Sequence, residues 1–241
     1  MKPGKLTKQF CCSFLFCIIL SSYCFCQVPV KFFTHGMYSP EQFAILKEVA
    51  GKYKKIPPLY EKQILIALSY FPELVNIHID FRFKHTNTSF STRPSLVSVF
   101  KRSSQRKYII TISDSSKAIL VPLQLKNLSF NAQIGVMGHE LSHAADFTNK
   151  TSFGLLRVAF GNLSNKFLDK LEFKTDSLCI AHGLGYQLLA WSTFIRTTMH
   201  YENWTGSVNI DKGPMLREKY MNPGTIMKKI SMSALYDHSN E

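Results

Sequence analysis

The spacing of apolar residues changes near residue 120, and this change constrains the fold more than any other feature of the sequence. Before it, residues 76–84 alternate apolar and polar side chains, as a half-buried strand does. After it, the apolar residues of 131–147 recur at the three- and four-residue spacing of a helix. We therefore expect the α+β class, with a small antiparallel sheet from the first half packed on a helical second half.

The same patterns predict the remaining elements. Helices are expected at 40–52, 59–70, 164–181, 186–198 and 225–232. Further strands are expected at 95–101 and Lys107–Ser113, joined as a hairpin by a turn at 102–105. No internal repeat divides the chain, so residues 27–241 are expected to form one domain.

Residues 1–26 have the order of a secretory signal peptide. A lysine-bearing start is followed by an apolar run from Phe10 to Leu20 and then by small and polar residues. This run is only about half as long as the roughly 20 residues that a bilayer span needs. We expect export by cleavage after Cys26 and a periplasmic or extracellular location in a bacterial context. Lipidation of Cys24 or Cys26 is the alternative.

The cysteines are concentrated in this N-terminal segment. Five of the six precede residue 27, and only Cys179 lies beyond it. Removal of the segment leaves Cys179 without a partner for an intramolecular disulfide. A packed core or a bound metal must therefore stabilise the mature chain.

The chain is basic, with 29 Lys and Arg against 16 Asp and Glu and a formal net charge of +13. Such a balance is typical of chains that meet nucleic acid, an anionic membrane surface or an acidic substrate. The clusters at 52–55 and 101–107 match no nucleic-acid module, and an exported chain rarely meets nucleic acid. We expect no nucleic-acid partner, and either a solvated basic face or peripheral contact with anionic envelope surfaces.

The expected helix at 131–147 carries the motif H-E-L-S-H, which begins at His139 and ends at His143. Residues four apart project from nearly the same line of a helix, so both imidazoles can reach one Zn²⁺. Glu140 is turned by about 100° from the first histidine, which suits a base acting on a water molecule at the metal. The motif therefore predicts a zinc site with His139 and His143 as ligands and Glu140 as the general base.

A catalytic zinc usually has a third protein ligand. The residues after the motif that can supply one are Asp146, Asp169, Glu172, Asp176 and His182. The motif followed by Leu171-Glu-Phe-Lys-Thr-Asp176 resembles the gluzincin metallopeptidases, and the Glu-x-x-x-Asp spacing resembles their HtpX-like branch. The resemblance covers His139 to Gly185. It implies that Glu172 is the third ligand and that Asp176 supports the site.

Side-chain length also favours Glu172, because it can reach the metal from a helix packed at the usual distance of about 8–10 Å. Asp176 is then expected to orient His139 or His143 through the free ring N–H. Asp146, one turn beyond His143, also suits a hydrogen bond to an imidazole. The alternative third ligand is His182, which would give a site with three histidines.

The resemblance implies peptide hydrolysis, in which Glu140 takes a proton from the attacking water and passes it to the leaving amine. A further donor is needed for the oxyanion of the tetrahedral intermediate. The candidates come after the expected helix at 164–181, which carries Glu172. They are His182, Tyr186, His200 and Tyr201.

The strand at Lys107–Ser113 precedes the motif helix, as the substrate-binding edge strand does in this superfamily. The resemblance thus implies that a peptide or protein substrate pairs along it. Two other functions stay open. One is a catalytically silent zinc-binding domain. The presence of Glu140 argues against it, because a purely structural site has no use for a base beside the metal. The other is a zinc amidase that acts on cell-wall material.

Overall fold

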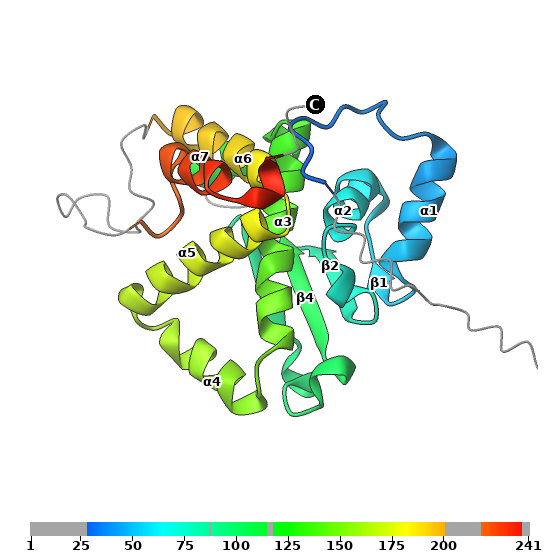
Figure 1. Ribbon diagram of the computed structural model, residues 1–241. Coiled ribbons are helices and arrows are strands. Elements are labelled where there is room, and N and C mark those ends of the chain that lie inside the picture. Colours follow the sequence, from blue (N-terminus) through cyan, green and yellow to red (C-terminus); the bar gives the residue numbers. More distant parts are fainter. Residues whose placement is uncertain (1–27, 87, 115–117, 201–217, 238–241) are drawn as a thin grey trace, which may run out of the picture.

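The computed structural model describes residues 28–86, 88–114, 118–200 and 218–237 (Figure 1). The predicted signal peptide lies outside these ranges. The helices of the described part are α1 (Pro40–Ala50), α2 (Glu61–Leu68), α3 (Phe130–Thr148), α4 (Ser152–Gly161), α5 (Asn165–Ala181), α6 (Gly185–Thr198) and α7 (Pro223–Ser231). Its strands are β1 (Lys54–Lys55), β2 (His78–Phe83), β3 (Phe90–Pro94) and β4 (Lys107–Ile112).

The strands form one mixed sheet in the order β1-β2-β4-β3. Its first two pairings, β1 with β2 and β2 with β4, are parallel, and only β3 and β4 are antiparallel. The predicted α+β class is confirmed, but the predicted antiparallel arrangement is wrong for the two parallel pairings. The reason is topological, because β4 returns to the sheet between β2 and β3 instead of following β3 at the edge.

The predicted hairpin between 95–101 and Lys107–Ser113 is also wrong. β4 pairs with β3, and the chain after Pro94 forms a short 3-10 helix at Leu96–Ser98. The side chains of Leu96 and Val97 are exposed, so their apolar character does not reflect a buried strand face. β4 lies inside the sheet and is almost wholly buried, so it is not the predicted edge strand. The edge beside the motif helix is β3.

Helix α3 runs through the centre of the molecule, between the sheet and α6 (Figure 1). Its N-cap is Ser129, whose hydroxyl accepts a hydrogen bond from the amide of Ala132 at 3.3 Å. Every residue from Asn131 to Phe147 is buried. The motif therefore lies on a buried helix, where polar side chains need partners.

The face of α3 that meets α6 has no side chain at Gly135. A methyl group there would lie 2.1 Å from the backbone oxygen of Gln187 in α6. Gly135→Ala is therefore expected to destabilise the fold by at least about 1–3 kcal/mol, the usual cost of overpacking. Urea denaturation measures this change.

Gly154 in α4 provides the matched control. A methyl group at this position would have its nearest neighbour at 3.4 Å. Gly154→Ala is expected to stabilise the chain by about 0.5–1 kcal/mol through helix propensity. Equal stability of the Gly135→Ala variant and the parent would contradict the close helix packing.

Helix α4 is absent from the elements that the sequence patterns predict. Leu155 and Val158 are its only buried residues, and the other large apolar residues of this helix lie at the surface. The helix therefore lacks the one-sided apolar pattern by which a packed helix is recognised. No helix within the described ranges has the length and hydropathy needed to cross a membrane.

Candidate metal centre

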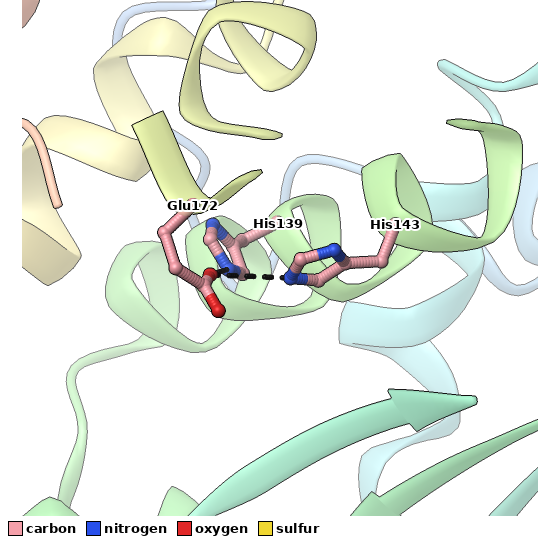
Figure 2. A group of neighbouring side chains, drawn as sticks. All are labelled: His139, His143 and Glu172. Carbon is pink, nitrogen blue, oxygen red and sulfur yellow. Dashed lines mark hydrogen bonds and ion pairs between the residues drawn. The ribbon is translucent and has the colours of Figure 1, made fainter. Parts of the chain in front are cut away.

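Two helices bring three potential metal ligands together (Figure 2). His139 and His143 project from successive turns of α3, and Glu172 reaches them from α5, which packs against α3. The Oε2 atom of Glu172 lies 3.1 Å from Nε2 of His139 and 3.2 Å from Nε2 of His143. These three residues form a group that could hold a metal ion, with ligand atoms all within 4.8 Å of one another.

The separations match what zinc requires. Two ligand atoms about 2.0–2.1 Å from a tetrahedral metal lie about 3.3 Å apart, close to the observed oxygen–nitrogen distances of 3.1 and 3.2 Å. Two imidazoles and one carboxylate are also a common protein ligand set for catalytic zinc. The residues present therefore fit the metal that the motif predicts.

The charges at this point favour a cation. Burial lowers the pKa of His139, but its hydrogen bonds to Asp176 and Glu172 and their negative charges outweigh burial and raise the pKa to about 10. Burial raises the pKa of Glu172, but the hydrogen bonds and charges of His139 and His143 lower it well below its usual value. Because the buried carboxylates stabilise positive charge here, they would also stabilise a divalent cation in place of the proton.

The Nδ1 atom of each imidazole ring has a hydrogen-bond partner on α5. Nδ1 of His139 donates to Asp176 Oδ1 at 2.8 Å, and Asp176 Oδ2 accepts from the amide of Met221 at 2.7 Å. Nδ1 of His143 lies 3.1 Å from Oγ1 of Thr175, which donates onward to the carbonyl of Leu171. With both Nδ1 atoms occupied, each ring directs Nε2 toward Glu172. The sequence reasoning anticipated this contact for Asp176 and missed Thr175.

Glu140 stands beside the three-residue group and is fixed by the sheet edge. Thr92 of β3 donates its hydroxyl proton to Oε2 of Glu140 at 2.6 Å. The same hydroxyl lies 3.1 Å from the backbone oxygen of Glu140. Glu140 is not a member of the ligand group within the described residues. Thr92 therefore holds one of the two carboxylate oxygens of Glu140 in place.

A cleft of about 520 Å³ opens over these residues. β3 forms one of its walls, and Leu188 and Trp191 of α6 lie on another. The ring of Trp191 is 5.2 Å from that of His139. The cleft therefore combines apolar side chains with convergent polar groups, as ligand-binding sites usually do.

Tyr220 is a residue of the cleft that the sequence reasoning missed. Its ring lies 5.8 Å from the His139 ring and 6.1 Å from Trp191. Burial and the charges of nearby carboxylates, Glu172 and Glu140 first among them, raise its pKa well above the usual value. The phenol therefore stays protonated at neutral pH. No motif or spacing links Tyr220 to the H-E-L-S-H helix, so only the folded chain identifies it.

Of the other candidate residues, those that the structure describes lie outside this group. The Asp146 carboxylate pairs with Lys150 and Lys174, so it joins α3 to α5 and contacts neither imidazole in the described part. Neither His182 nor Tyr186 lines the cleft. His182 donates to Glu73 at 2.8 Å and stacks on Phe71 at the end of α5. Tyr186 packs against Tyr236. His200 is exposed after α6, and Tyr201 lies outside the described residues.

Comparison of the chain with protein-family models, with curated proteins and with solved structures finds no match. What is shown about the site is therefore its geometry, a buried group of two histidines and one glutamate on α3 and α5.

Proposed function

We propose that this chain is an exported zinc-dependent peptidase, similar in its site to the gluzincins. The observation that carries the proposal is the convergence of His139, His143 and Glu172 in a cleft that also holds the carboxylate of Glu140. A structural zinc site usually closes all four positions with protein ligands and often uses cysteine. A three-ligand group in a cleft, with a carboxylate beside it, suits hydrolysis instead.

The residues of the chain have separate parts in this chemistry. His139, His143 and Glu172 would hold the ion, which when bound supplies a Lewis acid that lowers the pKa of water toward about 7. The Glu140 carboxylate takes the proton of the attacking water and passes it to the leaving amine. Thr92 holds one oxygen of that carboxylate and so directs the other.

Thr92→Val tests this positioning. Loss of a hydrogen bond to a charged group costs about 1.5–3 kcal/mol, so kcat is expected to fall about tenfold to hundredfold with little change in KM. Thr92→Ser, which keeps the hydroxyl, is expected to retain most of kcat, and both variants should keep the metal content of the parent. A raised KM with unchanged kcat would mean that Thr92 binds substrate instead.

Tyr220 is the best-placed donor for the oxyanion. It lines the cleft, its ring is near His139, and its raised pKa keeps the hydroxyl proton in place. Tyr220→Phe is expected to lower kcat about 10²–10³-fold, the usual loss for one oxyanion donor. Tyr186→Phe serves as the control, because Tyr186 packs against Tyr236 outside the cleft. Similar losses in both variants would remove Tyr220 from this role.

The substrate is proposed to bind as an added strand on β3. β3 is an edge of the sheet, and its residues Phe90, Ser91 and Thr92 line the cleft. An extended peptide can pair with such an edge through its backbone while its side chains enter the cleft. This proposal moves the substrate from the β4 segment, which lies inside the sheet, to the neighbouring strand.

Cleavage of a peptide library by the zinc-loaded protein, with a chelator-treated sample as the control, tests the activity. Cleavage that disappears with chelator and returns with zinc is the expected result. Fragments of cell-wall material form a parallel set of substrates. Hydrolysis of these fragments alone would assign the site to an amidase, and metal binding without any hydrolysis would assign it to a silent domain.

A further inference from the structure

Six large apolar side chains are exposed on two segments of the chain, 96–100 and 153–163. They are Leu96, Val97, Phe100, Phe153, Phe160 and Leu163, and each is between 71% and 87% exposed. We call this set the apolar end surface. Single exposed apolar residues are common, whereas several on segments held together in the fold are typical of an interaction site.

The two parts of the apolar end surface are joined in the fold. The hydroxyl of Ser152, the first residue of α4, donates to the backbone oxygen of Val99 at 2.9 Å. The guanidinium of Arg106 bonds to the carbonyl of Lys150 at 2.5 Å and to the Ser152 hydroxyl at 3.2 Å. These contacts hold the 96–100 segment against the start of α4, and both lie at the lower end of the molecule in Figure 1.

All charged residues of the two segments that carry these apolar side chains are basic. Lys101, Arg102, Arg157 and Lys166 are exposed beside the apolar residues. Neither 93–107 nor 150–168 contains an aspartate or a glutamate. A second copy of the chain would bring the same positive charges together, which opposes self-association through this face. A partner with an apolar interior and a negative surface matches both features.

An anionic lipid bilayer has these two properties. Aromatic and aliphatic side chains can enter the boundary between headgroups and acyl chains, while lysine and arginine remain at the anionic headgroups. We propose that the apolar end surface docks the protein onto anionic membranes. Asn162 lines the cleft and its neighbour Leu163 belongs to the apolar end surface, so docking would hold the cleft close to the lipid.

Flotation with lipid vesicles tests this proposal independently of any enzymatic activity. The protein is purified in the form that an exporting bacterial host produces. It is mixed with vesicles of phosphatidylcholine alone or of phosphatidylcholine with phosphatidylglycerol. Binding to the phosphatidylglycerol vesicles is expected to be at least about tenfold stronger and to weaken with added salt.

Two variants separate the apolar and the charge contributions. Phe153→Ser combined with Phe160→Ser is expected to weaken binding at least about tenfold. Lys101→Glu combined with Arg102→Glu is expected to remove most of the preference for phosphatidylglycerol. Circular dichroism and thermal unfolding should match the parent, because all four side chains are exposed.

Matched controls lie elsewhere on the surface. Leu59 is 75% exposed outside the apolar end surface, so Leu59→Ser removes a comparable apolar group. Lys52→Glu combined with Lys55→Glu makes the same change in net charge at another site. Both controls are expected to bind like the parent.

Three results would overturn the proposal. The first is no binding of the parent to phosphatidylglycerol vesicles, and the second is an equal loss of binding in the control variants. The third is that the parent dimerises in analytical ultracentrifugation, that the combined Phe153→Ser and Phe160→Ser variant does not, and that neither binds vesicles. That last result would assign the surface to a second copy of the chain.

Discussion

Glu140→Gln is expected to hydrolyse peptides about 10²–10⁴-fold more slowly than the parent, the range for a positioned general base. Glutamine has nearly the same shape, and its amide oxygen can still accept the hydrogen bond that Thr92 gives to Glu140. The variant cannot take a proton from water, however. Steady-state kinetics on a cleaved library peptide measures the loss, and metal analysis should show the zinc content of the parent.

Glu172→Gln provides a matched comparison across the same cleft. The carboxylate of Glu172 contacts both imidazoles, while that of Glu140 is not in the ligand group. The same chemical change at residue 172 is therefore expected to reduce metal content as well as rate. Hydrolysis by Glu140→Gln at the parental rate, with zinc content preserved, would refute the assigned mechanism.

His139→Ala is expected to reduce bound zinc from about one equivalent per chain to near zero, because a catalytic zinc site has about three protein ligands. The substitution also leaves the buried carboxylates of Asp176 and Glu172 without their shared partner. Metal analysis of the purified protein by mass spectrometry measures the equivalents. Asp176→Asn changes only the carboxylate that accepts a hydrogen bond from Nδ1 of His139. This substitution is expected to weaken zinc binding about 10–100-fold.

His182→Ala is the control for this loss. His182 is bonded to Glu73 and stacked on Phe71. This variant should therefore bind about one equivalent of zinc, as the parent does. Unchanged zinc content in His139→Ala would end the zinc hypothesis. Loss of zinc in both His139→Ala and His182→Ala, with zinc retained in Glu172→Gln, would favour the three-histidine alternative.

The sequence predicted those elements whose burial leaves a regular pattern. Helices such as α3 and α5 repeat apolar residues at helical spacing and were found within a few residues of their bounds. β3 was missed because Phe90 is its only large apolar residue and none of its residues is buried. The exposed residues Leu96 and Val97 suggested a strand instead, since an apolar pattern indicates burial only when the core is its cause.

The residues of the site also fall into two groups, those that the sequence predicts and those that only the tertiary structure brings to the site. The sequence alone determined that His139 and His143 share one face of a helix and that Glu140 lies beside them, because helical geometry relates residues within one turn. Contacts between residues far apart in the sequence depend instead on how the helices and strands pack in the tertiary structure. Thr92 reaches Glu140 only because β3 pairs outside β4, and Tyr220 reaches His139 only because its segment is bonded to Asp176 through Met221. No spacing in the sequence encodes such contacts, since they depend on how α3 packs between the sheet and the other helices.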